Sequence, residues 1–469
     1  MAAREGSTVE FVRVLTRLDA TSLVVGSMIG SGIFIVSADI LRQVGSPGLM
    51  LVVWAVAGVV TLMGALTYGE LAALFPRAGG QYVYLRESIS PLFGYLYGWT
   101  LFAVIQTGTI AAVAVAFAKF ASVFLPALSP DVFLGATVAL PTGDIDVGLS
   151  PQRLLAVALV VALTVVNVRG VHTASRVQNA LTAVKVGAVL LLIACGLTLG
   201  RTPDAAVNFG ASFWPADVSF AVLPALGAAM VGALFAMDAW NNVGFAAGEL
   251  RAPHRDLPFA MTAGVVTVVA LYLLANLAYL SVLPADAIAH APEDRVGTAV
   301  LEAMFGPTGL YLMAAAIMIS TAGCSNGMIL SGARLYYAMA RDGLFFRRAG
   351  ELHPAHRTPV FGLTLQAVWA SVLCLSGTYG QLLDYVIFAA LLFYLLTALG
   401  LFALRVRRPD LERPVRVPFY PWLPALYVLA ATLICVNLIV EKPQYSGAGL
   451  CIVALGIPLF FISRRLART

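Results

Sequence analysis

The sequence predicts an all-α integral membrane protein with twelve transmembrane helices, of which the first and the sixth are broken near their middles. Of the 469 residues, 60% are apolar and only 11% are charged, which is about half the charged fraction of a soluble domain. The apolar residues form runs of 18 or more, long enough to cross a bilayer. Two of these runs are interrupted at mid-depth by glycines or polar side chains.

A span needs roughly 20 apolar residues. This rule places the twelve helices near residues 19–45, 48–75, 91–125, 152–170, 180–200, 222–249, 258–283, 298–341, 358–376, 381–405, 421–440 and 446–465. None of the connections between them is long enough for a soluble domain. We therefore expect residues 1–469 to form a single transmembrane domain.

The basic residues predict the orientation of these helices. Twelve spans place both termini on one side, and if that side is inside, most of the 29 lysines and arginines fall in inner segments. Such an excess of positive charge marks the cytoplasmic side, so we expect a cell-membrane protein with both termini in the cytoplasm. The net charge of +5 then reflects topology, and we expect no nucleic-acid partner.

The cysteines and histidines indicate neither a metal site nor a catalytic site. All five cysteines lie in apolar runs without metal-ligand spacing, and the five histidines are scattered among loops. A metal site or a membrane-embedded enzyme would need such residues in clusters. We therefore expect no cofactor, no metal and no enzymatic activity.

The first span contains three glycines and two serines between Gly26 and Gly32. Small residues can form a packing face between membrane helices, but the run Gly30-Ser31-Gly32 points in every direction. Glycine tolerates irregular backbone angles, and irregular backbone at membrane depth persists only where it lines a cavity. We therefore interpret this segment as unwound.

The sixth span carries Asp238, Asn241 and Asn242 at mid-depth. Such polar groups mark a substrate or ion path, although a polar contact between helices is the alternative. Two interruptions that lie five spans apart indicate an inverted-repeat transporter with a site at the membrane midplane. The repeats are expected over about residues 19–200 and 222–405, and two further helices over about 421–465.

The orientation of the two breaks suggests a ligand. The second half of the first span starts near Ile33 with free backbone N–H groups, which favour an anion. The first half of the sixth span ends near Phe235 and Ala236 with free carbonyls, which favour a cation. The two together match the carboxylate and the ammonium of an α-amino acid.

These residues resemble the motifs of a known family. Residues 30–34 are similar to the GSGIF signature of the amino acid–polyamine–organocation (APC) superfamily. Further similar motifs follow in order at residues 68–71 with 75–82, 235–241 with 248–258, and 324–327. The resemblance covers essentially the whole chain, and residues 177–186 and 238–242 look most like bacterial L-amino acid transporters of the LAT type.

The resemblance implies a LeuT-type fold, with a 5+5 inverted repeat and two extra helices. The substrate-binding residues that it implies are Met28, Ile29, Gly30, Ser31, Gly32, Ile33, Phe235, Ala236, Asp238 and Asn241. Residues 30–33 would bind the carboxylate, and Phe235 would be an aromatic gate. Asp238 departs from the small residue common in animal members, so it either caps the second half of the sixth helix or contacts substrate.

Lys185 lies in the fifth span and is one of three lysines. It could extend its ammonium to the membrane interface. In the resembled family a lysine at this position replaces the sodium ion of sodium-coupled relatives, which implies contacts with carbonyls near residues 28–30 and with Ser320 or Thr321. Transport would then not need sodium, although a buried lysine can release its proton and so leaves proton coupling open.

Two other charged residues have predicted structural partners. We expect Glu70 to pair with Arg77 rather than to carry protons, and Arg334 to pair with an acid. Animal LAT-type members are disulfide-linked to a heavy subunit through a cysteine in the loop after the third span. The corresponding loop here, residues 126–151, contains no cysteine, so we expect no disulfide-linked heavy subunit.

The sequence thus predicts a sodium-independent secondary transporter of L-amino acids, with neutral amino acids as the first choice. It is expected to work in the bilayer as an exchanger by alternating access. A proton-coupled amino-acid symporter and a transporter of cationic amino acids or polyamines remain the alternatives.

Overall fold

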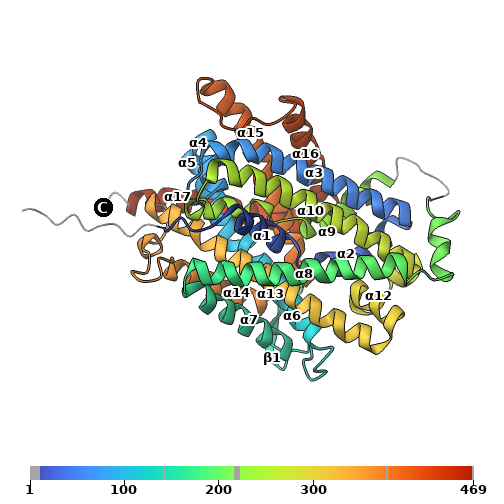
Figure 1. Ribbon diagram of the computed structural model, residues 1–469. Coiled ribbons are helices and arrows are strands. Elements are labelled where there is room, and N and C mark those ends of the chain that lie inside the picture. Colours follow the sequence, from blue (N-terminus) through green and yellow to red (C-terminus); the bar gives the residue numbers. More distant parts are fainter. Residues whose placement is uncertain (1–10, 141–142, 216–221, 377–378, 467–469) are drawn as a thin grey trace, which may run out of the picture.

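The computed structural model describes residues 11–140, 143–215, 222–376 and 379–466 as a bundle of long helices (Figure 1). The α-helices are α1 (Arg17–Met28), α2 (Gly32–Val44), α3 (Pro47–Leu74), α4 (Gln81–Ser88), α5 (Pro91–Thr100), α6 (Gln106–Ala121), α7 (Pro151–Val168), α8 (Val171–Thr198), α9 (Val222–Ala236), α10 (Pro253–Val282), α11 (Ala285–Ala289), α12 (Val296–Phe305), α13 (Pro307–Arg341), α14 (Val360–Cys374), α15 (Tyr379–Arg407), α16 (Trp422–Glu441) and α17 (Pro443–Leu466). Shorter elements are the π-helix η1 (Leu101–Ile105) and the 3₁₀ segments η2 (Asp204–Phe209), η3 (Trp240–Glu249), η4 (Pro292–Asp294) and η5 (Arg347–Gly350).

The helix lengths agree with a protein that crosses the membrane many times. Within the described residues, ten helices are long and apolar enough to span a bilayer, and the bent pair α1 and α2 counts as an eleventh. The ninth predicted span corresponds to α14, an apolar helix of only 15 residues, which is shorter than the roughly 20 residues of a typical span. The helix lengths therefore do not confirm that the chain has twelve transmembrane helices.

Both predicted helix interruptions are present. The first span is bent by 40° between α1 and α2, and the unwound segment is residues 29–31. The sixth span stops at Ala236 and resumes as η3 at Trp240. The intervening Ala239 has φ 69°, a left-handed conformation that no helix interior contains.

The eighth predicted span, residues 298–341, is wrong as a single helix. It consists of α12 and the 35-residue α13, which meet at Gly306. Gly306 has φ 62°, and Pro307 opens α13 at a position where its missing N–H costs no helical hydrogen bond. This Gly-Pro pair therefore ends one helix and starts the next.

The expectation of a purely helical chain needs one correction. Strands β1 (Leu134–Leu140) and β2 (Gly143–Leu149) pair antiparallel, with Leu134 opposite Leu149. They occupy the connection between α6 and α7. The Gly148 N–H donates to the Leu375 carbonyl at 3.0 Å, which attaches this hairpin to the end of α14.

The broken helices lie inside the bundle. Helix α1 contacts α8, α10 and α13, and α2 packs along α9, in agreement with the central positions of α1, α9 and α10 in Figure 1. By contrast, only 22% of the most apolar stretch of the last helix, α17, is buried. Helix α17 therefore lies at the periphery of the bundle. Interior irregular segments surrounded by regular helices can line a cavity without exposing backbone to lipid.

Candidate functional site

The two helix breaks contact each other. Gly32 begins α2, and a side-chain carbon placed there would lie 2.6 Å from the Cβ of Ala236, the last residue of α9. No real carbon can approach so closely, so the contact requires glycine at this position. The start of α2 therefore lies beside the carbonyl end of α9.

A small cavity of about 20 Å³ lies at this contact. It is lined by Ser27, Met28, Gly30, Ser31, Gly32, Thr109, Val113, Phe235, Ala236, Asp238, Ala239 and Cys324. Most of the predicted site residues are therefore together. Ile29 and Ile33 do not appear in this lining; both side chains are fully buried.

A second small cavity, of about 10 Å³, lies next to the first. Its lining is Tyr97, Leu101, Ile105, Gln106, Thr109, Asp238, Ala239, Asn241, Asn242, Met328, Ala390 and Tyr394. The predicted residue Asn241 belongs to this second cavity, and Asp238 lines both. The π-helix η1 supplies Leu101 and Ile105, and π-helical turns often occur at functional sites.

Asp238 is held by a buried chain of hydrogen bonds. The Tyr394 hydroxyl donates to Asp238 Oδ1 at 2.5 Å and lies 3.2 Å from Asn241 Oδ1. Asn241 donates to Gln81 Oε1 at 2.7 Å, and Gln81 donates to Thr397 at 3.0 Å. The carboxylate is therefore fixed against α15 and α4.

The predicted capping role of Asp238 corresponds to a single hydrogen bond in the structure. Its carboxylate accepts a hydrogen bond from the backbone of Ala239, which is the N-cap residue of η3. Sequence reasoning did not foresee Tyr394, because it lies in the middle of the predicted span 381–405, where it looks like an ordinary aromatic residue of an apolar helix.

Lys185 lies beside the first break. Its ammonium donates to the backbone carbonyls of Gly26, Ile29 and Ser320, each at 2.8 Å. An ammonium has three protons, so these three acceptors use all of them. The side chain is 1% exposed, which excludes an extended position at the interface.

Helix α13 also holds the first break in place. The Ser320 hydroxyl lies 3.1 Å from the Ile29 carbonyl and 3.0 Å from that of Gly30. One turn further along, the Cys324 thiol donates to the Ser27 carbonyl at 2.8 Å. The Thr321 hydroxyl bonds to Ile317 and Met318 in its own helix, so Ser320 is the member of the predicted pair that contacts the break.

Comparison with known proteins places this architecture in a family. Residues 15–461 match the family model described as amino acid permease. The chain belongs to the amino acid permease family. It is 30% identical over 455 residues to the human b(0,+)-type amino acid transporter 1, covering 95% of this chain and 86% of the relative.

A second relative of this permease is a large neutral amino acids transporter subunit. The chain is 30% identical over 472 residues to the mouse large neutral amino acids transporter small subunit 2, covering 98% of this chain and 83% of the relative. The APC superfamily resemblance is thus confirmed, and the permease is a multi-pass membrane transporter rather than an enzyme. Within the described residues, no group of three or more His, Cys, Asp or Glu could hold a metal ion.

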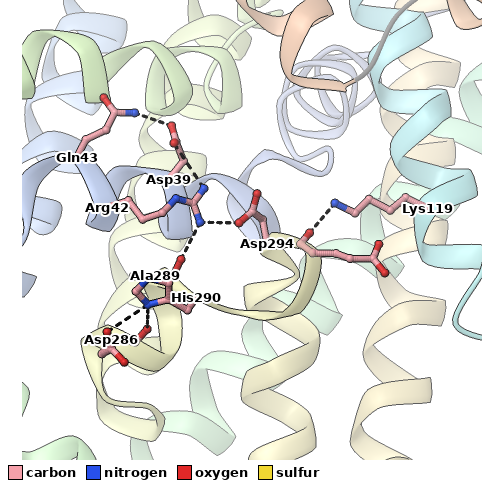
Figure 2. Close-up of polar contacts among 9 residues, drawn as sticks. Asp39, Arg42, Gln43, Lys119, Asp286, Ala289, His290 and Asp294 are labelled. Carbon is pink, nitrogen blue, oxygen red and sulfur yellow. Dashed lines mark hydrogen bonds and ion pairs between the residues drawn. The ribbon is translucent and has the colours of Figure 1, made fainter. Parts of the chain in front are cut away.

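The broken first helix of the permease is tied at the end of the bundle where α2 terminates, which we call the α2 end (Figure 2). Arg42 on α2 donates to the Ala289 carbonyl at 2.7 Å and pairs with Asp294 at 2.6 Å. Lys119 on α6 donates to the Glu293 carbonyl at 2.5 Å. These contacts join α2 and α6 to the last residue of α11 and to the segment between α11 and α12.

Further ion pairs tie the opposite end, where α1 begins, which we call the α1 end. Arg17 pairs with Asp256 on α10 at 2.9 Å. Arg334 pairs with Glu249 through two bonds of 3.0 and 3.1 Å. The prediction that Arg334 pairs with an acid is confirmed. The cavities therefore lie between two ends that are both held together by charged contacts.

The predicted partner of Glu70 is wrong. Glu70 is fully buried and pairs with Arg405 at 2.5 Å and with Arg413 at 3.2 Å, while the Val417 N–H donates to it at 2.9 Å. Arg77, the predicted partner, is exposed to solvent. Glu70 thus attaches α3 to the end of α15 and to the segment that follows, through residues more than 300 positions away in the chain.

Proposed function

We propose that the permease is a sodium-independent transporter of L-amino acids that works as an exchanger by alternating access. The observation that carries this proposal is the Lys185 ammonium, which fills a three-carbonyl position beside the broken first helix. A fixed ammonium supplies the positive charge that a bound cation would otherwise bring. The helix breaks then need no sodium ion to neutralise their carbonyl ends.

The amino-acid substrate is inferred from the contact between the breaks. The N–H groups at the start of α2, around residues 30–33, favour a carboxylate, and the carbonyl end of α9 favours an ammonium. The close approach of Gly32 to Ala236 brings these two positions within the span of one α-amino acid. Phe235 lines the same cavity and acts as the aromatic gate.

Neutral amino acids are the proposed main substrates, with one specific observation in favour of cationic ones. Asp238 lines both cavities. A carboxylate beside the space for the substrate's side chain would attract a lysine or arginine substrate. The Tyr394 bond at 2.5 Å occupies one of its oxygens. Competition by L-lysine against uptake of L-leucine distinguishes the two classes.

We also propose that the permease lies in the cell membrane with the α1 end in the cytoplasm and that it works without a disulfide-linked heavy subunit. This proposal is supported by the loop 126–151, which has no cysteine. Migration as a single band of unchanged size on denaturing gels with and without reductant supports this. A reductant-sensitive larger species would contradict it.

Counterflow in proteoliposomes tests the transport mechanism. Vesicles loaded with unlabelled L-leucine should accumulate labelled L-leucine equally well in sodium and in choline buffers, and without a pH gradient. Accumulation that requires sodium would overturn the proposal. Accumulation into empty vesicles that is driven by an inward proton gradient would favour the symporter instead.

A further inference from the structure

Gln81 belongs to a ring of buried hydrogen bonds beside the second cavity. It donates to the Thr397 hydroxyl at 3.0 Å and accepts from the Asn241 amide at 2.7 Å. Asn241 Oδ1 lies 3.2 Å from the Tyr394 hydroxyl. Tyr394 and Thr397 are one turn apart on the same face of α15. Two residues of one helix therefore hold the pair formed by Gln81 and Asn241 between them.

The glycines before α4 place Gln81 at this position. Gln81 is the first residue of α4, is 1% exposed and is not among the residues that line the two cavities. The preceding Gly80 has φ 45°, and a side-chain carbon on it would lie 2.7 Å from the carbonyl carbon of Gly244. The Gly79 N–H donates to the Phe245 carbonyl at 3.2 Å. These contacts hold the start of α4 against η3.

The directions of the hydrogen bonds in the ring determine how the Asn241 amide is turned. The Thr397 hydroxyl gives its one proton to the Phe393 carbonyl at 2.8 Å, so its oxygen accepts from Gln81 Nε2. Gln81 Oε1 is then the acceptor for Asn241 Nδ2. Because its N–H group is directed at Gln81, Asn241 turns Oδ1 toward the Tyr394 hydroxyl.

The Asn241 oxygen keeps its capacity to accept a hydrogen bond. A phenol carries one proton, and Tyr394 gives it to Asp238 Oδ1 at 2.5 Å rather than to Asn241 Oδ1 at 3.2 Å. Asn241 and Asp238 both line the second cavity. A substrate group with a proton to donate there meets acceptors on both residues. An apolar group would leave the Asn241 oxygen without a donor, which costs free energy in a buried site.

We propose that Gln81 is a positioning residue that turns the Asn241 oxygen toward the second cavity and thereby favours substrates whose side chains carry a hydrogen-bond donor. This inference rests on the proposed transport of amino acids and names a class among the neutral ones. L-glutamine and L-methionine represent the two cases, because their side chains have similar lengths and only glutamine carries N–H groups. The selectivity ratio is the KM for L-methionine divided by the KM for L-glutamine, both measured in exchange.

Replacement of Gln81 tests the inference. Gln81→Met removes both hydrogen bonds at nearly the same side-chain volume and frees the Asn241 amide to turn. It should lower the selectivity ratio about three- to tenfold, which corresponds to the net contribution of one hydrogen bond. Gln81→Glu keeps an acceptor oxygen for Asn241 and should retain the wild-type ratio. Thr397→Val removes the acceptor that orients Gln81 and should lower the ratio by about twofold.

Gln178 on α8 provides the matched control. It is 1% exposed, accepts from the Asn326 amide at 2.9 Å and donates to the Thr182 hydroxyl at 3.5 Å. These are the same types of partner that Gln81 has, but none of the three residues lines either cavity. Gln178→Met should therefore leave the selectivity ratio within about twofold of the wild-type value, even if its maximal rate falls.

The KM values are measured with full-length protein in proteoliposomes and in cells that express the variants. Because KM does not depend on the amount of folded protein, a merely destabilised variant keeps the wild-type selectivity ratio. If Gln81→Met yields no active protein, the comparison of Thr397→Val with the wild type replaces it.

Three results would overturn the inference. They are an unchanged ratio in Gln81→Met (or in Thr397→Val where that variant replaces it), an equal fall in Gln178→Met, and a fall in Gln81→Glu as large as that in Gln81→Met. Wild-type protein that exchanges no L-amino acid would contradict the proposed function instead, so failure of the function and failure of the Gln81 inference give different results.

Discussion

The Lys185 ammonium lies 2.8 Å from the carbonyl oxygen of Ile29, in the unwound segment of the first helix. This contact links the fifth predicted span to the first break. The same ammonium reaches Gly26 on one side and Ser320 on the other. A single buried charge therefore joins two carbonyls of the broken first helix, those of Gly26 and Ile29, to one in the middle of α13.

Replacement of Lys185 by alanine should reduce exchange at least about 100-fold, because three buried carbonyls lose their charged donor and the break loses its shape. Lys119→Ala is the matched control, since Lys119 makes one carbonyl contact at the α2 end, and it should keep at least about half of the activity. Labelled L-leucine counterflow and thermal unfolding in detergent give the two readouts. A Lys185→Ala protein that exchanges L-leucine at the wild-type rate would contradict the proposed role of Lys185 at the first break.

Replacement of Gly32 by alanine should impair exchange strongly. The new methyl group would lie 2.6 Å from the Ala236 Cβ and 2.8 Å from its Cα, so the breaks must separate at a cost of about 1–3 kcal/mol. Gly187→Ala on α8 is the control, because a methyl group there meets no atom within 4 Å. Comparable losses of exchange in both variants would show that the contact between the breaks is not the cause.

Replacement of Asp238 by asparagine should discriminate between substrates. If Asp238 attracts a cationic side chain, Asp238→Asn should raise the KM for L-lysine about tenfold more than the KM for L-leucine. Tyr394→Phe, which frees the carboxylate oxygen bonded at 2.5 Å, should leave the ratio of the KM for L-lysine to the KM for L-leucine unchanged. If Asp238→Asn changes the KM for both substrates equally, Asp238 instead maintains the structure of the break in the sixth helix.

Replacement of Glu70 by glutamine should destabilise the protein, by about 3–5 kcal/mol, because two arginines lose their buried counter-charge. Arg77→Ala should leave the thermal midpoint unchanged, since Arg77 is exposed. Thermal unfolding with and without substrate measures both. Should Glu70→Gln instead keep its stability and lose only a response to the proton gradient, Glu70 would be a proton carrier.

The contacts at the α2 end should control rate rather than stability. Arg42 and Asp294 are more than one third exposed, so the pair contributes about 0–1 kcal/mol. If opening of the α2 end limits the transport cycle, Arg42→Ala and Asp294→Ala should each raise the exchange rate at saturating substrate about two- to fivefold. The exchange rate of the double variant should be close to that of either single variant. Additive effects would show that the two residues act separately.

The breaks could be predicted from the sequence because their signals are local. Glycine and serine at residues 26–32 and polar side chains at residues 238–242 conflict with lipid-facing helix wherever they occur. Lys185 could be singled out for the same reason, since a charge within a span needs buried partners. The Gly306-Pro307 division of the eighth predicted span was an equally local signal that the hydropathy pattern concealed.

The partners of these residues could not be predicted in the same way. Glu70 was matched to Arg77, which is close in sequence, whereas its partners Arg405 and Arg413 approach only when α15 folds against α3 and α4. Tyr394 looked like an ordinary aromatic residue of an apolar span. Its hydroxyl acquires a partner only because the chain brings Asp238 to within hydrogen-bonding distance.

The sequence by itself determined that the chain crosses the membrane many times and where its first and sixth helices break. These follow from the cost of placing polar groups and irregular backbone in lipid, which each segment carries alone. Only the tertiary structure decided that Gly32 meets Ala236, that Asp238 lies between two cavities, and that Gln81 bonds to Asn241. Hydrogen bonds and close contacts depend on distances of a few ångströms between segments far apart in the chain, and packing alone sets those distances.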